Sequence, residues 1–557
     1  MTTESISQLI LAKAQQFGPK LAVCMYGEPA EQYTYGELDK ASGRLAAEFR
    51  DMGIGPNDRI VILSESRPRW AIAFFATLRV GAVAVPLDAR MTDTELSVVL
   101  EQVKSKLIVV SRQQELRVSE YLAHSDDGVF VMSIEAANAS SEYSSVDVPH
   151  QNTTHPCVLR NENDAAVITF TSGTTGSSKG VVTTYGNLLH EIRSFRSVLK
   201  NDSRCTTVSI LPLSHLFELT AGFLGVLYGG GRICFCESLM PTDIVAAMQE
   251  QKITCMVTVP LFLKLMASSI QKEIAILPLW QRRAFTLTRI ISPHIPMLWR
   301  RRMFARIRER FGGALEYFIC GGAPLESETR KFFDSIGLPV YQGYGLAEAS
   351  PVIATNGPGA NYPGSVGRPL PGVEVAIDER NGNEILTRGP HIMRGYLGDV
   401  VATEKMIDAD GWLHTGDVGH ISDDGYLFVS GRQKNIIVLG SGKKVQPEEV
   451  EDALFRHPLI QEGCVIGTIA DRGLLAGSEE VCAIAVASKD AVMQFADRMA
   501  ELRKEVRNVI EQQAKCLSPC KRPTRIVLRC EPLPRTSSRK VRRQNLREWI
   551  SQETLLS

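Results

Sequence analysis

The sequence predicts an α/β fold with more than one domain. Short β-rich runs, such as residues 165–170 (AAVITF) and 315–320 (LEYFIC), alternate with helical stretches, which is the pattern of an α/β protein. Each run leads into a loop rich in Gly, Pro, Ser or Thr. The chain has 557 residues, whereas a single hydrophobic core rarely grows beyond about 250–300 residues. Several cores are therefore expected.

Helical periodicity is visible between the predicted strands. Apolar residues recur at spacings of four, three and three at Leu188, Ile192, Phe195 and Val198. In α/β sheets, ligands bind outside the carboxyl ends of the strands. The loops that follow the predicted strands are therefore the places where a functional site is expected.

Two changes of character divide the chain. Residues 134–160 are polar and irregular, which indicates a surface connection inside the first domain. Beyond residues 431–434 a shorter α/β pattern begins, with a strand predicted at 435–439 and a helix near 448–455. About 120 residues follow this point, which is enough for a small separate domain.

Charge and composition exclude some classes of protein. The 62 basic and 62 acidic residues cancel, so the overall charge indicates no nucleic-acid partner. The N-terminus lacks the basic start and apolar run of a secretory signal. The most apolar stretch, residues 219–228, is too short to span a membrane and contains two glycines. The twelve cysteines lack zinc-type spacing and are expected to be reduced in a cytoplasmic protein.

Residues 171–180 (TSGTTGSSKG) directly follow a predicted strand. Glycines let the backbone approach an anion and point N–H groups at it. The neighbouring hydroxyls can donate further hydrogen bonds, and Lys179 adds a mobile positive charge, so the segment suits a polyphosphate. Its spacing does not fit the Walker loop. A flexible Ser/Gly loop without function is the alternative.

This segment resembles the phosphate loop of the ANL superfamily of adenylate-forming enzymes, which includes acyl-CoA synthetases, adenylation domains of peptide synthetases and firefly-type luciferases. It departs from the usual pattern once, because Ser178 stands where proline is common. That change removes some stiffness but no hydrogen-bond donor. The resemblance implies that the phosphates of ATP are bound by Thr171, Ser172, Gly173, Thr174, Thr175, Gly176 and Lys179.

The resemblance covers nearly the whole chain. It implies a large N-terminal AMP-binding domain of several α/β subdomains at residues 1–431 and a hinge at residues 432–434. A small, mobile α+β domain is implied at residues 435–557.

Two further loops resemble the adenine site of this superfamily. The motif YQGYGLAEAS implies that Tyr344 stacks on the base and that Glu348, with Thr171, binds Mg²⁺. This ion favours oxygen ligands and shares its coordination shell with phosphate. An exposed glutamate without function is the alternative. The other residues implied to contact the nucleotide are Gly322, Ala323 and Pro324 in the motif GGAPL, and Gly343 and Gly345 beside the tyrosine.

The motif LPLSHLFE resembles the acyl-binding motif, in a form typical of long-chain acyl-CoA synthetases. His215 is thereby implied to be an adaptable aromatic wall near the carboxylate of the substrate. A purely structural histidine is the open alternative.

Three motifs near the C-terminus complete the resemblance. WLHTGD implies that Asp417 accepts hydrogen bonds from both ribose hydroxyls. GRQK implies that Arg432 also reaches the ribose and that Lys434 is the pivot of the hinge. PRTSSRK implies that Lys540 bridges the substrate carboxylate and the α-phosphate, although Arg539 stands where glycine is usual. A solvated basic tail is the alternative for this last motif.

The resemblance implies that the enzyme activates a carboxylic acid, with a medium- to long-chain fatty acid as the expected class, to an acyl-adenylate. The acyl group then passes to the thiol of coenzyme A. ATP, Mg²⁺ and coenzyme A are the expected cofactors, and the loop at residues 439–444 is expected to flank the pantetheine arm. The alternatives are a ligase or stand-alone adenylating enzyme with an acyl carrier protein as acceptor, luciferase-like oxygenation, and a non-catalytic acyl-binding relative.

Residues 282–310 carry nine arginines interleaved with Ile, Leu, Met, Trp and Phe. Three explanations are open: a solvated basic face, a contact with an anionic membrane surface, and a dock for an acidic carrier protein. The second explanation would place a cytoplasmic protein at the inner face of the membrane.

Overall fold

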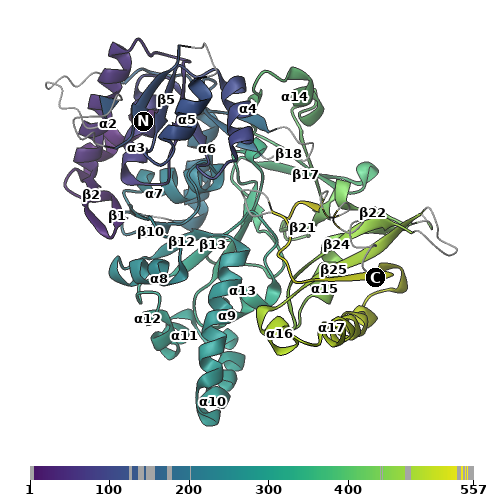
Figure 1. The fold of residues 1–557 in the computed structure, drawn as a ribbon. Helices are drawn as coiled ribbons and strands as arrows, with labels where there is room; N and C mark the ends of the chain where they lie inside the picture. Colours follow the sequence, from purple (N-terminus) through teal and green to yellow (C-terminus); the bar gives the residue numbers. More distant parts are fainter. Residues whose placement is uncertain are drawn as a thin grey trace. The chain divides into compact units, whose positions relative to one another are not determined.

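The computed structural model describes residues 5–123, 128–135, 144–145, 157–171, 178–200, 202–439, 441, 443–470, 478–535, 541–543, 546 and 549. The chain forms two compact units (Figure 1). The first comprises Met1–Glu374 and Thr387–Leu413, and the second comprises Val375–Leu386 and His414–Ser557. Helices and strands alternate in both units, so the predicted α/β fold class is confirmed.

The first unit contains a nine-stranded sheet with a parallel centre. Its strands are β1 (Leu21–Tyr26), β2 (Glu28–Thr34), β10 (Thr206–Ser209), β11 (Arg232–Cys236), β12 (Cys255–Thr258), β13 (Tyr317–Cys320), β14 (Val340–Tyr344), β15 (Ala354–Thr355) and β16 (Arg368–Pro369). They lie in the order β16-β15-β14-β13-β12-β10-β11-β1-β2. Every pair from β14 to β1 is parallel. The loops after β10, β13 and β14 therefore leave the same edge of the sheet.

An eight-stranded sheet is the second layer of this unit. Its strands are β3 (Arg59–Leu63), β4 (Val83–Leu87), β5 (Leu107–Val110), β6 (Phe130–Ser133), β7 (Ser144–Ser145), β8 (Ala165–Thr171), β9 (Lys179–Thr184) and β19 (Gly395–Tyr396). The order is β19-β9-β8-β4-β3-β5-β6-β7. β8 and β9 form an antiparallel hairpin whose last pair is Thr171 opposite Lys179. The predicted strand at residues 165–170 is thus confirmed.

Helices surround these sheets. They are α1 (Leu9–Phe17), α2 (Tyr35–Asp51), α3 (Pro68–Arg79), α4 (Asp93–Val103), α5 (Glu115–Leu122), α6 (Tyr185–Leu199), α7 (Gly225–Tyr228), α8 (Pro241–Glu250), α9 (Pro260–Ile276), α10 (Leu279–Ile291), α11 (Met297–Met303), α12 (Ala305–Glu309), α13 (Ser327–Ser335) and α14 (Val400–Met406). The helix predicted from the spacing at residues 188–198 is α6, and it begins at a capping box made by Thr184 and Asn187. In the part of the chain that the structure describes, no helix has the length and apolar character that crossing a bilayer requires.

The largest core is aromatic. Trp70 and Phe74 stack on α3, and Phe223 meets Trp70 edge-on with a centroid separation of 5.7 Å. All three side chains are buried. Edge-to-face contacts of this kind stabilise a packed core beyond the burial of apolar area. Phe223 belongs to a π-helix (Glu218–Leu224), so the apolar stretch expected at residues 219–228 is a short buried element of this core.

The second unit contains three small sheets, the smallest of which pairs β22 (Ile437–Val438) with β23 (Lys444–Val445). β17 (Glu374–Asp378), β18 (Glu384–Arg388), β20 (Leu413–Ile421) and β21 (Leu427–Arg432) form one four-stranded sheet. A three-stranded sheet of β24 (Ile460–Ile469), β25 (Glu479–Ala487) and β26 (Arg525–Arg529) packs with α15 (Pro447–Leu454) and α17 (Met499–Gln513). Packing therefore joins residues 414–431 to the C-terminal part. The predicted hinge at residues 432–434 stays a prediction, because compactness does not locate a pivot.

Candidate active site

The β8–β9 hairpin carries the two described ends of the predicted phosphate loop. Thr171 ends β8 and Lys179 begins β9, and the Thr171 hydroxyl donates to the Lys179 carbonyl oxygen at 3.5 Å. The predicted residues Ser172, Gly173, Thr174, Thr175 and Gly176 lie outside the described residues. The structure thus brings the hydroxyl and ammonium groups of the prediction to one hairpin mouth.

Tyr396 joins Lys179 to Glu348. Its hydroxyl donates to Glu348 Oε1 at 2.8 Å, and Lys179 Nζ lies 4.8 Å from the centroid of its ring. Tyr396 is placed by the pairing of β19 with β9, where it faces Val181. Burial and the Glu348 carboxylate raise the pKa of the Tyr396 phenol, so the hydroxyl remains a hydrogen-bond donor.

Sequence reasoning missed Tyr396. The residue belongs to a strand of two residues, which is too short for a periodic pattern, and its partner Glu348 lies 48 positions away in the sequence. Its one signal in the sequence is an aromatic side chain that lies between Gly395 and Leu397. Contacts of this kind are decided by tertiary structure.

The two predicted adenine loops leave adjacent parallel strands. Cys320 at the end of β13 pairs with Gln342 in β14, so the loop at residues 322–324 and the loop at residues 343–345 start at the same sheet edge. Gly322, Ala323 and Pro324 are exposed, and Tyr344 is half-buried. This edge is where a ligand binds in open α/β sheets.

Gly345 is packed too closely to accommodate a side chain without a shift of its neighbours. A Cβ atom at this position would lie 2.0 Å from the carbonyl oxygen of Pro351. Gly343 differs, because an added Cβ would make only ordinary contacts at 3.5 Å. The sequence grouped both glycines as nucleotide contacts, whereas the structure assigns Gly345 a packing constraint of its own.

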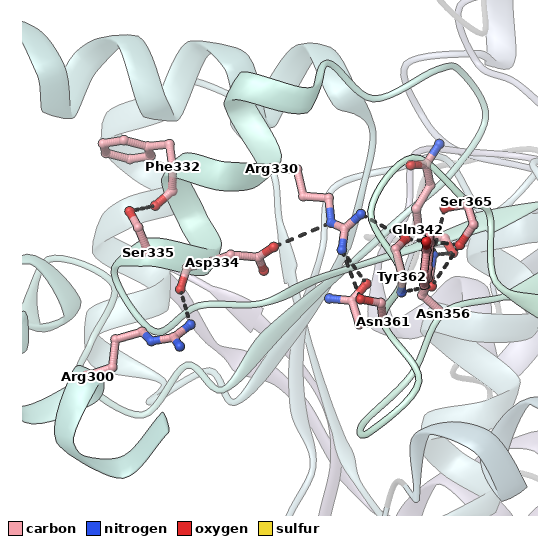
Figure 2. A network of polar contacts seen from close by, with 10 residues as sticks. All are labelled: Arg300, Arg330, Phe332, Asp334, Ser335, Gln342, Asn356, Asn361, Tyr362 and Ser365. Atoms are coloured by element: carbon pink, nitrogen blue, oxygen red, sulfur yellow. Dashed lines mark hydrogen bonds and ion pairs between the residues drawn. The ribbon is translucent and has the colours of Figure 1, made fainter. Parts of the chain in front are cut away.

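A polar network holds the loop after β14 (Figure 2). Asn356 donates from its backbone to the Gln342 carbonyl oxygen at 2.9 Å and from its side chain to the Ser365 carbonyl oxygen at 2.8 Å. Arg330 of α13 donates to the carbonyl oxygens of Tyr362 and Asn361 at 3.0 and 3.1 Å. Gln342 precedes Gly343 directly, so this network fixes the strand end from which Tyr344 emerges.

His215 lies beside an acid that sequence reasoning did not select. Its Nε2 atom is 4.0 Å from Asp88 Oδ2, and Asp88 follows β4 in the other sheet. Arg90 donates to both Asp88 oxygens at 3.0 Å. Burial opposes ionisation of Asp88, but the bonds from Arg90 outweigh it and lower the pKa of the carboxyl. His215 therefore faces a fixed negative charge as well as apolar neighbours.

Glu218 begins the π-helix three residues after His215. It is buried, and burial raises the pKa of its carboxyl to about 8. Ser209 of β10 donates to Glu218 Oε1 at 2.6 Å, which ties the helix to the sheet. A Cβ atom on Gly222 would come 2.6 Å from the Glu218 Cδ atom, so the glycine makes room for the acid. π-Helical turns occur frequently at functional sites.

In the second unit, Asp417 and Arg432 form a pair. They are opposite each other in β20 and β21, and Arg432 Nε lies 2.7 Å from Asp417 Oδ1. Asp417 is buried and its backbone N–H donates to the Thr415 hydroxyl at 3.1 Å. The two residues predicted to bind the ribose are therefore already held together. Lys434 follows in a short 3₁₀ turn (Gln433–Asn435).

Lys540 and Arg539 lie outside the described residues. Two of the flanking basic residues form ion pairs, whereas Arg542 is exposed. Arg535 forms an ion pair with Glu462, and Arg543 contacts Glu448 and Glu451 at 3.1 and 2.7 Å. These pairs hold the chain at the start of the predicted lysine motif and just after it.

The donor set suits Mg²⁺ and phosphate. The β8–β9 hairpin of the first unit supplies a hydroxyl from Thr171 and an ammonium group from Lys179. Tyr396 links this hairpin to the carboxylate of Glu348. No group of three or more His, Cys, Asp or Glu side chains is assembled within the described ranges. Mg²⁺ usually takes only one or two carboxylates and shares the rest of its shell with water and substrate phosphates. The residues therefore fit this ion.

Comparisons with known proteins show the family of this chain. Residues 11–397 match the AMP-binding enzyme family, and residues 449–540 match the AMP-binding enzyme C-terminal domain. The long-chain-fatty-acid–CoA ligase FadD15 of Mycobacterium bovis is 30% identical over 441 residues, which cover 75% of this chain and 72% of that protein. The medium-chain fatty-acid–CoA ligase of Escherichia coli is 27% identical over 543 residues, covering 93% of this chain and 86% of the relative.

A solved structure shows the same fold. ATP-bound MatB from Rhodopseudomonas palustris superposes with a TM-score of 0.77 at 24% identity, over 98% of each chain. The first family match alone covers well over half of the sequence. The resemblance inferred from the phosphate loop is thereby confirmed, and the chain belongs to the AMP-binding enzyme family within the adenylate-forming ANL superfamily.

Proposed function

We propose that this enzyme activates a medium- to long-chain fatty acid as its acyl-adenylate and transfers the acyl group to coenzyme A. The products are acyl-CoA, AMP and pyrophosphate. The observation that carries the proposal is the convergence of Lys179 and Glu348 on Tyr396 at the mouth of the β8–β9 hairpin. ATP, Mg²⁺ and coenzyme A are the cofactors of this class of ligase. The names of the two relatives support the fatty acid as substrate.

The first step requires positive charge and aligned donors. A carboxylate is a poor acyl donor, because its oxygen is a bad leaving group, and its attack on the α-phosphate of ATP brings two anions together. Such a reaction depends on electrostatic stabilisation and positioning rather than on a protein nucleophile. In the proposal, Lys179 neutralises phosphate oxygens, and Glu348 with Thr171 would hold Mg²⁺. Tyr396 orients the Glu348 carboxylate by its hydrogen bond.

The remaining predicted residues have roles at the two ends of the substrates. Asp417 and Arg432 are proposed to hold the ribose, with the arginine fixing the acid in place. His215 is proposed to face the carboxylate of the fatty acid, and its own orientation is set by Asp88. Lys540 is proposed to bridge this carboxylate and the α-phosphate.

The second step requires access of a thiol to the acyl-adenylate. We retain the proposal that a hinge at residues 432–434 separates a domain at residues 1–431 from one at residues 435–557. Lys434 would be the pivot, and the loop at residues 439–444 would flank the pantetheine arm. We also propose that this is a cytoplasmic enzyme in peripheral contact with an anionic membrane surface, where long-chain acids accumulate.

The decisive experiment measures acid-dependent release of AMP from ATP over fatty acids of graded length, with and without coenzyme A. Turnover that needs both the acid and coenzyme A, with acyl-CoA formed, supports the proposal and ranks the chain lengths. If the adenylate forms but no acyl-CoA appears, the acyl acceptor is a carrier protein rather than coenzyme A. Absence of ATP turnover with every acid contradicts the proposal.

A further inference from the structure

Residues 276–303, here called the apolar–basic projection, expose large apolar side chains to solvent. The projection comprises the end of α9, the whole of α10 and α11, and it extends away from the strands of its unit in Figure 1. No residue of α10 is buried. Trp280 is 69% exposed, Leu287 61% and Trp299 58%. Clustered exposure of this kind marks an interaction surface rather than an ordinary solvated helix.

The exposed apolar stripe of α10 is not the side that packs on the protein. Phe285 packs edge-on against the buried Phe304 at 5.7 Å, and Ser292, which follows the helix, is buried. Trp280, Leu287 and Ile291 recur at spacings of seven and four, so they lie on one stripe of the helix. Successive residues turn by about 100°, which separates this stripe from the position of Phe285 by more than a quarter turn. The helix thus has one apolar contact with the core and a second apolar stripe in solvent.

The nine arginines of residues 282–310, which overlap the apolar–basic projection, divide into two groups. Arg300, Arg301 and Arg308 donate to backbone carbonyl oxygens, as Arg300 does to Asp334 at 2.8 Å (Figure 2), and Arg310 pairs with Glu273. The other five face no carboxylate among the residues that the structure describes. They are Arg282, Arg283, Arg289, Arg302 and Arg306. Residues 277–308 contain no Asp or Glu at all.

We infer that the apolar–basic projection docks on the surface of an anionic lipid bilayer. Trp280, Leu287 and Ile291 enter the headgroup region, and Arg282 and Arg283 contact lipid phosphates. Amphipathic helices with tryptophan on the apolar side and arginine beside it bind in this way. The exposed apolar area argues against a merely solvated basic face. An anionic membrane interface offers both an apolar layer and negatively charged phosphates, which match the apolar stripe and the arginines beside it.

This inference rests on the proposed function in one respect: a long-chain acid partitions into bilayers, which gives the enzyme a reason to bind a membrane. It is tested without turnover, by flotation of the full-length protein with vesicles of phosphatidylcholine alone and of an equal mixture with phosphatidylglycerol. The expected result is flotation with the anionic vesicles that is lost at about 1 M NaCl, where the Debye length is about 3 Å. AMP release with a water-soluble medium-chain acid is measured in parallel, so failure of either proposal is seen separately.

Two pairs of substitutions separate the charge from the apolar stripe. Arg282→Glu with Arg283→Glu is expected to lower the partition coefficient at least about twenty-five-fold, since each cationic side chain contributes roughly a factor of five. The matched control reverses two exposed arginines elsewhere in the same unit, Arg112→Glu with Arg193→Glu, and keeps full binding. All variants keep the AMP release of the unaltered enzyme in solution.

The apolar pair Trp280→Ser with Leu287→Ser is expected to lower partitioning at least about a hundredfold, because two large side chains no longer leave water. Its control replaces the exposed Leu116 and Met240 by serine and binds normally. Equal losses in the projection variants and in their controls overturn the inference. So does absence of flotation with anionic vesicles, or retention on an immobilised acidic acyl carrier protein without any binding to vesicles.

Discussion

Tyr396→Phe tests whether the link between Glu348 and Lys179 organises the active site. The substitution removes the hydroxyl that donates to Glu348 Oε1 at 2.8 Å and leaves the ring below Lys179. A hydrogen bond to a charged group contributes about 1.5–3 kcal/mol. Tyr396 and Glu348 are both only half-buried, so solvent screening favours the lower end of that range. A loss of about 1.4 kcal/mol is tenfold in rate.

The assay is fatty-acid-dependent exchange of pyrophosphate into ATP, measured over a titration of Mg²⁺. We expect kcat/KM to fall about tenfold. The Mg²⁺ concentration for half-maximal rate should rise, because Glu348 loses the bond that orients it. Tyr396→Leu also removes the contact with Lys179, whose cation–π energy of about 0.5–1 kcal/mol predicts a further two- to fivefold loss.

Tyr185→Phe is the matched control, because its hydroxyl is buried in the same unit and has no hydrogen-bond partner among the described residues. It should leave the exchange rate and the Mg²⁺ dependence unchanged. A Tyr396→Phe enzyme whose kcat/KM stays within twofold of the original at every Mg²⁺ concentration would refute the reasoning. The hydrogen bond would then be a packing feature without influence on catalysis.

Three further predictions concern other parts of the site. The Glu218 carboxyl has a folded pKa of about 8 against an ordinary value of 4.5, so its contribution to stability is present below the ordinary value and is lost as the pH rises towards 8. Thermal unfolding should show the Tm of Glu218→Gln rising relative to that of the unaltered protein as the pH increases from about 4.5 to 8. A Tm difference that does not change with pH would contradict the raised pKa of Glu218. Asp417→Asn weakens the partner of Arg432 and should raise KM for ATP about tenfold with a smaller change in kcat, as steady-state kinetics would show; an unchanged KM would remove the ribose role. Lys540→Ala should abolish adenylate formation but still transfer the acyl group from supplied acyl-adenylate to coenzyme A, and equal loss of both half-reactions would contradict separate conformations.

Local patterns were sufficient for the fold class, and they nominated most candidate residues, whose roles stay predictions. The strand at residues 165–170 and α6 follow from apolar runs and helical spacing, which depend on neighbours within one or two turns. The phosphate loop and the motif around Tyr344 could be found because the chemistry requires several particular residues in one short stretch. Thr171 and Lys179 are only eight positions apart, and the hairpin formed by β8 and β9 places them opposite each other.

Sequence periodicity could not supply the contacts between distant segments. Asp88 meets His215 only because two sheets bring the ends of β4 and β10 together, and no pattern within either segment encodes that distance. Tyr396 reaches Glu348 for a similar reason, since a two-residue strand pairs with β9. Side chains far apart in the chain acquire their roles from packing, which depends on the whole core.

The arginine-rich segment shows the division most clearly. The sequence by itself determined that residues 282–310 are strongly basic and interleaved with apolar residues, and it left three explanations open. Only the tertiary structure decided which arginines are used by backbone carbonyl groups and which face solvent beside Trp280 and Leu287. The physical reason is that charge and hydropathy are properties of a residue, whereas exposure and pairing are properties of its surroundings in the fold.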